Sequence, residues 1–165
     1  MSLERHLYVG LGSNLDDPQG HVERALEELD RLPLTRRLSG SRLYASRPLG
    51  PQDQPDFINA AARLESRLSP LALLDQLQAL EQRHRRLRRR RWGPRTLDLD
   101  LLLYGGLSLH TPRLTLPHPE MLGRSFVMVP LAELAGSWTL PDGRTIAAVA
   151  AGLDGTDLHP VLPAI

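Results

Sequence analysis

The amino-acid sequence predicts a single α/β domain of the α+β kind, in which helices pack on a mainly antiparallel sheet. Segments with strand-like and helix-like patterns follow one another in the order strand, helix, strand, strand, helix, strand. The chain has 165 residues, enough for one hydrophobic core. It contains no cysteine, so neither disulfides nor thiolate chemistry are expected. We therefore expect one domain over residues 1–165.

The first strand is expected over residues 6–14, HLYVGLGSN, with Gly10 and Gly12 leading into a tight strand-to-helix turn. Asp17 and Pro18 then provide an N-cap and a proline for the first turn of a helix. The apolar face of this helix consists of Val22, Ala25, Leu26 and Leu29.

Two more strands and a second helix follow the first helix. A strand is expected over residues 38–45, and residues 47–55, RPLGPQDQP, form a loop because they contain three prolines and a glycine. Residues 57–66, FINAAARLES, form the next strand, and Ser69 and Pro70 repeat the N-cap and proline signal. The expected apolar side of the second helix consists of Leu73, Leu77, Leu80, His84 and Leu87.

A leucine-rich strand with two aspartates comes next, in the segment RWGPRTLDLDLLLY. Its leucines at 97, 99, 101 and 103 alternate with Asp98, Asp100 and Leu102, so the two carboxylates share one face about 7 Å apart at Cα. A turn-rich passage over residues 114–135 then leads into a short helix. This order is that of a ferredoxin-like split βαβ sandwich with its helices on one sheet face, which leaves the other face for function.

The aspartate pair allows two interpretations. It is either a solvated face of an edge strand or a functional site. Acidic residues are depleted in strands, and the flanking leucines make the strand apolar enough to be central, where an unpaired carboxylate is costly. Mg²⁺ commonly takes one or two protein carboxylates and completes its shell with phosphate and water. The pair therefore indicates magnesium-dependent phosphate chemistry.

Arginine supplies all 20 basic side chains, and seven arginines lie between residues 83 and 91. Such a run, with Trp92 as a stacking ring, is also typical of nucleic-acid binding. The net charge is only +1, aromatic residues make up 4% of the chain, and the cluster occupies one segment. Arginine binds compact phosphate groups bidentately, so a polyphosphate is the favoured partner, rather than nucleic acid.

The opening residues, MSLERHLYVGLGSN, have too short an apolar run for a signal peptide or membrane span, so a cytoplasmic protein without a membrane partner is expected. GxG occurs at Gly10, but no third glycine follows at the dinucleotide spacing, and a P-loop is absent because the chain has no lysine.

Four segments carry a family resemblance: GLGSNL, YASRPLGPQDQPDFINAA, RWGPRTLDLDLLLYG and LPHPEMLGRSFVMVPL. In order and spacing they resemble the bacterial 6-hydroxymethyl-7,8-dihydropterin pyrophosphokinases of folate biosynthesis, over about residues 6–143. The resemblance implies the ferredoxin-like fold and transfer of the pyrophosphoryl group of ATP to the pterin hydroxymethyl group, with release of AMP. It also implies that Asp98 and Asp100 bind two Mg²⁺ ions.

The resemblance further implies roles for individual residues. The catalytic set would be Arg88, Arg95, Asp98 and Asp100. The pterin would be bound by Ser46, Leu49, Phe57, Asn59 and Phe126, with the two rings stacking on it and Asn59 on its edge. ATP would be bound by Gln78, Glu81, Arg86, Arg88, Trp92, Arg95, Leu101, Arg113, Thr115, His118 and Arg124. A surface ion pair is the alternative for Glu81, and ordinary core packing is the alternative for each phenylalanine.

The sequence also departs from the family pattern. Arg47 stands where a proline is expected, Phe57 stands where a tyrosine is common, and the interval from Glu81 to Asp98 is one residue shorter. The segment after Gly143 has no counterpart in the resemblance. We expect a monomer; the alternatives are a nucleic-acid-binding module and a magnesium-dependent phosphotransferase for another heterocycle.

Overall fold

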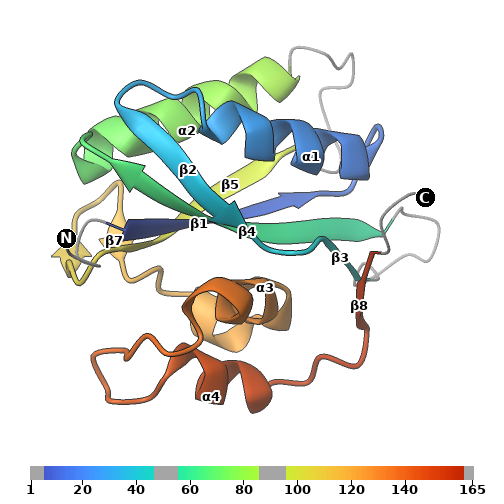
Figure 1. Ribbon diagram of the computed structural model, residues 1–165, viewed down its shortest axis with the longest axis vertical. Coiled ribbons are helices and arrows are strands. Elements are labelled where there is room, and N and C mark those ends of the chain that lie inside the picture. Colours follow the sequence, from blue (N-terminus) through green and yellow to red (C-terminus); the bar gives the residue numbers. More distant parts are fainter. Residues whose placement is uncertain (1–5, 47–55, 86–95, 162–165) are drawn as a thin grey trace.

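The structure is a computed structural model that describes residues 6–46, 56–85 and 96–161. Six strands form an antiparallel sheet in the order β5-β1-β4-β3-β8, and β2 also pairs with β4 (Figure 1). Their bounds are β1 His6–Ser13, β2 Thr35–Gly40, β3 Tyr44–Ser46, β4 Phe57–Ser66, β5 Asp98–Tyr104 and β8 Leu158–Pro160. The expected order of elements and the ferredoxin-like arrangement are confirmed.

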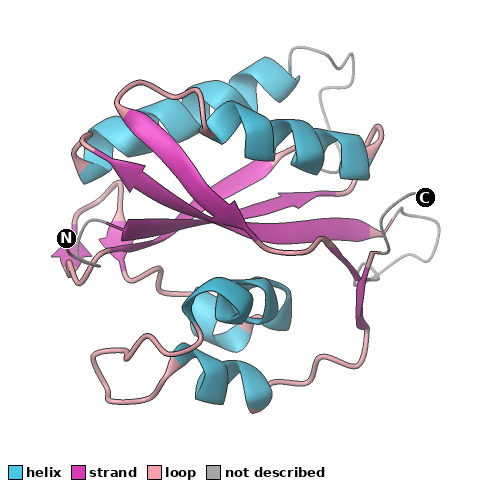
Figure 2. Ribbon diagram, viewed as in Figure 1, coloured by secondary structure: helices cyan, strands magenta, loops and turns pink. Residues whose placement is uncertain are grey.

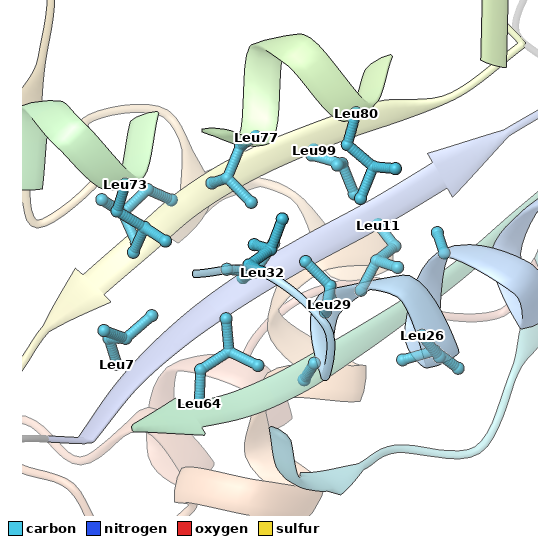
Figure 3. Packing of buried hydrophobic residues seen from close by; sticks show 14 of the residues in the cluster. Leu7, Leu11, Leu26, Leu29, Leu32, Leu64, Leu73, Leu77, Leu80 and Leu99 are labelled. Atoms are coloured by element: carbon cyan, nitrogen blue, oxygen red, sulfur yellow. The ribbon is translucent and has the colours of Figure 1, made fainter. Parts of the chain in front are cut away.

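Helices α1 (Pro18–Leu29) and α2 (Pro70–Arg85) cover one face of this sheet (Figure 2). Both expected caps are present. An Asp17 carboxylate oxygen accepts from the Gly20 amide at 3.2 Å, and the Ser69 hydroxyl accepts from the Ala72 amide at 3.2 Å. The apolar sides of the two helices meet the leucines of β1, β4 and β5 in one continuous core (Figure 3).

A second helical layer lies on the opposite face of the sheet, although the sequence analysis placed all helices on one face. Helices α3 (Ser125–Ala135) and α4 (Ile146–Ala151) pack there, beneath the sheet in Figure 1. This second core consists of Tyr8, Leu102, Leu103, Met121, Met128, Leu131, Ala135, Leu140, Ile146 and Val149. The prediction of helices on one face only was wrong because the segment after β5 adds its own apolar side chains to the sheet.

Three local predictions are corrected by the tertiary contacts. Strand β1 runs through Gly10 and Gly12 to Ser13, so neither glycine makes the turn to α1. The strand expected over residues 38–45 is divided into β2 and β3, and both pair with β4. Between them, Ser41 keeps the ladder connected, because its amide donates to the Ala61 carbonyl at 2.8 Å and its hydroxyl accepts from the Ala61 amide at 2.9 Å.

A register shift changes the direction of one leucine in β5. Tyr8 pairs with Leu103, but Val9 pairs with Leu101, so Leu102 is an extra residue on β5. Leu101 faces α1 and α2, whereas Leu102 and Leu103 both belong to the second core. The simple alternation expected for residues 97–103 therefore ends at Leu102.

The segment between β5 and α3 contains a small hairpin, β6 (Leu109–His110) and β7 (Thr115–Leu116), and the short helix η2 (Met121–Gly123). Within the described ranges, no helix is long and apolar enough to cross a membrane.

Candidate active site

The two aspartates of β5 lie on the sheet face opposite α1 and α2. Leu97, Leu99 and Leu101 are buried toward those helices, and Asp98 and Asp100 are half-buried on the other side. Among the strands that the structure describes, β5 lies at the edge of the sheet and pairs with β1 alone. Asp98 pairs with Gly12, and Asp100 pairs with Gly10. The expected carboxylate pair is therefore present, and the strand beside it carries no side chains at these two positions.

A cross-strand row connects the aspartates to Asn59. Gly12 is paired with Asp98 on one side and with Asn59 of β4 on the other, so all three residues point to the same face. Two strand spacings separate Asp98 from Asn59, which is roughly 10 Å between Cα atoms. We call the surface formed by Asp98, Asp100, Gly10, Gly12 and Asn59 the carboxylate face.

Asn59 is 5% exposed and is held by β3. Its amide nitrogen donates to the Ser46 hydroxyl at 3.3 Å. A buried primary amide has two N–H donors and one carbonyl acceptor, and this one contact uses only part of that capacity. The structure therefore brings together Ser46 and Asn59, two residues of the expected pterin site, and leaves hydrogen-bonding capacity on Asn59.

The two predicted ring residues lie on different elements. Phe57 is on β4, two residues before Asn59, and so shares the face of Asn59. Phe126 is in the first turn of α3, where its ring is 38% exposed and the Arg124 guanidinium lies 5.9 Å from its centre. Phe126 is therefore not part of the buried core, and its ring is accessible from the surface.

Glu81 has a contact that neither of its sequence interpretations included. It lies on α2, and one of its carboxylate oxygens accepts from the Leu99 amide at 2.8 Å, on the open edge of β5. This bond holds the peptide group that joins Asp98 to Leu99. The pKa of Glu81 is raised, mainly because burial disfavours its charge and also because Asp98 and Asp100 repel it, although the Leu99 amide opposes the shift.

Further predicted residues lie on the segments that connect the carboxylate strand to α2 and η2. Arg113, in the turn between β6 and β7, donates to Asp75 at 2.7 Å and to Gln78 at 3.1 Å, both on α2. Thr115 begins β7. The His118 amide donates to the Leu102 carbonyl at 2.9 Å, so the turn before η2 is tied to β5.

The remaining predicted residues lie on the surface, in the core or outside the described ranges. Arg124 is paired with Glu120 on the protein surface. Leu101 is 2% exposed and buried under the helices, so only its backbone is available to a ligand. Predicted residues outside the described ranges are Leu49, Arg86, Arg88, Trp92 and Arg95.

The two aspartates of the carboxylate face are possible ligands of a divalent cation. The described ranges contain no group of three or more histidine, aspartate or glutamate side chains arranged around one point. Two aspartates on one strand face are nevertheless a suitable donor set for Mg²⁺, because that ion commonly keeps water and substrate phosphate in its remaining positions. Burial is the main cause of the raised pKa of Glu81, and the charges of Asp98 and Asp100 add to it.

A carboxylate pair on one face of an α+β sandwich, with Gly12 between Asp98 and the buried amide of Asn59, fits the class of metal-dependent phosphotransferases that act on a polar small molecule. A family model agrees with this class. Residues 8–136 match the family described as 7,8-dihydro-6-hydroxymethylpterin-pyrophosphokinase (HPPK). The chain belongs to this family.

Curated relatives carry the same description. A Pseudomonas aeruginosa protein, named 2-amino-4-hydroxy-6-hydroxymethyldihydropteridine pyrophosphokinase, is 54% identical over 140 residues, which is 85% of this chain and 86% of the relative. A Haemophilus influenzae protein of the same name is 50% identical over 139 residues, covering 84% of this chain and 87% of the relative.

Solved structures support the fold. The Plasmodium falciparum HPPK-DHPS wild type with pteroate matches with a TM-score of 0.71 and 12% identity, over 88% of this chain. The chain spans 42% of that solved chain, so the likeness concerns one part of a longer protein.

Proposed function

We propose that the carboxylate face is the site at which this chain transfers a pyrophosphoryl group from ATP to the hydroxymethyl group of 6-hydroxymethyl-7,8-dihydropterin. As a member of its family the chain is a pyrophosphokinase of folate biosynthesis, and ATP is its co-substrate. The observation that supports this site is the row Asp98, Gly12 and Asn59, in which the proposed metal-binding carboxylate and the proposed pterin-binding amide are separated by one glycine.

Asp98 and Asp100 would hold magnesium, and we propose two ions, as the resemblance of the LDLD segment implies. Bound magnesium neutralises triphosphate charge and polarises the attacking hydroxyl oxygen. The role of the protein is to keep two carboxylates on one rigid strand face. Glu81 supports this strand by accepting a hydrogen bond from the amide of Leu99, the residue between the two aspartates.

We propose that the pterin lies beside Asn59. The amide of Asn59 can donate to and accept from the edge of a pterin, and Ser46 orients this amide. Phe57 and Phe126 would stack on the ring faces, and Leu49 would complete the wall through its backbone. With the ring at Asn59, the hydroxymethyl group would lie over Gly12 on the way to Asp98, because Gly12 pairs with both residues and carries no side chain.

ATP would then occupy the region from β5 to α2 and η2. Residues proposed to bind it are Gln78, Glu81, Arg86, Arg88, Trp92, Arg95, Leu101, Arg113, Thr115, His118 and Arg124. Arg113 and Gln78 are already in contact, and Leu101 would contribute backbone only. Arg88 and Arg95 are proposed to lie nearest the transferred phosphates, where guanidinium groups offset charge that develops in the transition state.

In this arrangement the protein accelerates the reaction mainly by position. Rigid strands hold the hydroxymethyl oxygen and the β-phosphorus in line, which removes much of the entropic cost of bringing two substrates together. We also propose that residues 1–165 act as one unit, as a cytoplasmic monomer that does not bind nucleic acid.

Product identity tests the proposed reaction. Attack on the β-phosphorus releases AMP and gives the pterin diphosphate, whereas attack on the γ-phosphorus releases ADP and gives a monophosphate. We expect AMP and pterin diphosphate in equal amounts when ATP, Mg²⁺ and the pterin are mixed with the protein. Stoichiometric ADP, AMP formed without pterin, or nucleic-acid retention without turnover would each contradict the proposal.

A further inference from the structure

Two buried histidines join α1 to α2, outside the carboxylate face. His21 lies on α1 and His84 lies in the last turn of α2, and each is 3% exposed. Their Nδ1 atoms are 2.7 Å apart, and their ring centres are 4.9 Å apart. In the sequence, His84 was assigned to the apolar side of a helix, but its ring is part of a polar chain.

The neighbours of the two rings favour one arrangement of the ring protons. A guanidinium group only donates, and an Arg24 guanidinium nitrogen lies 3.3 Å from Nδ1 of His21, which favours an unprotonated Nδ1 on His21. The proton between the two Nδ1 atoms therefore belongs to His84. On the other side of the same ring, Nε2 lies 2.6 Å from a Glu28 carboxylate oxygen, which accepts a hydrogen bond from it. In this arrangement both ring nitrogens of His84 donate, and Nδ1 of His21 accepts.

This geometry accommodates one positive charge on the two rings. A second proton would have to go onto Nδ1 of His21, and two N–H groups would then face each other across 2.7 Å. The contact between the rings would break, because neither nitrogen could accept. A buried pair of like charges is also costly in itself.

The charges around His21 agree with this state. Its pKa is lowered, first by burial, then by the charges of His84 and Arg24, while Asp17 and Asp16 oppose the shift. Glu28 is the charged partner of His84. The sheet beneath the helices presents Val9, Leu11 and Leu99, which are apolar.

The pair is connected to the carboxylate strand through α2. Glu81 precedes His84 by three residues, about one helical turn, and Glu81 bonds the Leu99 amide between Asp98 and Asp100. We propose that His84 is a positioning residue. Its hydrogen bonds to His21 and Glu28, which we call the clasp, hold one positive charge on the two rings and fix the end of α2 and thereby the carboxylate strand. Binding of a second proton breaks the clasp and lowers turnover.

The protonation state can be measured directly on the wild-type protein. Nitrogen-15 spectra at pH 7.5 should show both ring nitrogens of His84 protonated and Nδ1 of His21 unprotonated. A spectrum in which Nδ1 of His84 carries no proton would overturn the assignment.

The kinetic test uses His21→Asn. The side-chain oxygen of asparagine can accept from Nδ1 of His84 but cannot take a proton in this range. His159→Asn, at an exposed histidine of β8, is the matched control. About one pH unit below the pKa of His21, roughly nine tenths of the wild type carries the second proton, so its kcat should fall severalfold at saturating substrates. The same fall is expected in His159→Asn, and a smaller one in His21→Asn.

Coincident pH profiles for the wild type and His21→Asn would overturn the proposed link to turnover. Temperatures well below the melting midpoint keep global unfolding out of the comparison. If His21→Asn does not fold, the wild-type nitrogen-15 titration, compared point by point with the wild-type kcat profile, decides: a second protonation that leaves kcat unchanged refutes the clasp. This inference rests on the proposed function for its kinetic readout, and wild-type AMP formation at pH 7.5 tests that function separately.

Discussion

Gly12 and Asn59 face each other across β1 and β4 so closely that a Cβ atom on Gly12 would lie 3.0 Å from Oδ1 of Asn59. This separation is tighter than an ordinary carbon–oxygen contact, so a side chain at Gly12 would require the Asn59 amide, which lies beside Ser46, to shift by a few tenths of an ångström. The absence of a side chain at Gly12 therefore allows Asn59 to keep its position. It also leaves the position between Asn59 and Asp98 without a side chain.

Gly12→Ala should accordingly weaken pterin binding while ATP binding is retained. Loss of about one amide hydrogen bond corresponds to roughly 1.5 kcal/mol, or about a tenfold higher dissociation constant. Calorimetric titration with each substrate measures both constants. Gly106→Ala is the control, because a Cβ there meets no atom within 4 Å. Equal weakening of pterin binding in both variants would refute the steric argument.

Glu81→Gln tests the buried carboxylate on α2. The pKa of Glu81 is raised, so the ionised form is destabilised in the folded protein relative to the unfolded chain. The stability associated with this group is fully present below its unfolded pKa and is lost as pH rises through the folded pKa. Glutamine can still accept from the Leu99 amide but carries no charge.

The melting temperature of Glu81→Gln without ligands should therefore equal that of the wild type at about pH 4, below the unfolded pKa, and exceed it increasingly toward pH 7. Thermal melts at several pH values give this difference. A difference that is largest in acid would contradict the raised pKa. Added Mg²⁺ should reduce the difference at pH 7, because a nearby cation favours the ionised carboxylate.

Arg113→Ala separates stability from nucleotide binding. The guanidinium pairs with Asp75 at 2.7 Å, but both side chains are about half exposed, so the pair contributes little to folding. We expect the free energy of unfolding to change by less than about 0.5 kcal/mol, while the KM for ATP rises severalfold. Arg144→Ala, whose pair with Asp142 lies on the surface away from the carboxylate face, should leave KM unchanged. An unchanged KM in Arg113→Ala would remove it from the ATP site.

The sequence predicted the parts of this fold that depend on local signals. Caps at Asp17 and Ser69 and the helical periodicity of the leucines are encoded within a few residues, and both helices begin where these signals lie. The shift at Leu102 and the helices on the second face could not be predicted, because they depend on contacts with residues far along the chain.

The same distinction applies to the candidate site. Asp98 and Asp100 were found because two acids in an apolar strand are a local anomaly. Gly12 was assigned to a turn, because its neighbours in the sequence do not show that it pairs with Asn59 and Asp98 across the sheet. The bond between Glu81 and Leu99 joins a helix to an open strand edge, and the contact between His21 and His84 joins two helices. Neither contact leaves a signal in the sequence.

The carboxylate pair provides the final prediction. Asp98→Asn and Asp100→Asn keep the size of the side chains but remove one negative charge each from β5. If both carboxylates hold magnesium against the triphosphate, kcat should fall by roughly 100-fold or more in each variant, the scale of losing one electrostatic partner of a transition state. Pterin binding should survive, because Asn59 and Ser46 lie two strands and more away from β5.

Asp154→Asn, at an exposed turn, controls for the loss of one charge elsewhere. Rates measured with titrated Mg²⁺ and the binding constant of the pterin distinguish the outcomes. Turnover retained in both variants would exclude the pair as the magnesium site, whereas loss of pterin binding together with turnover would mean that the substitutions distort the sheet.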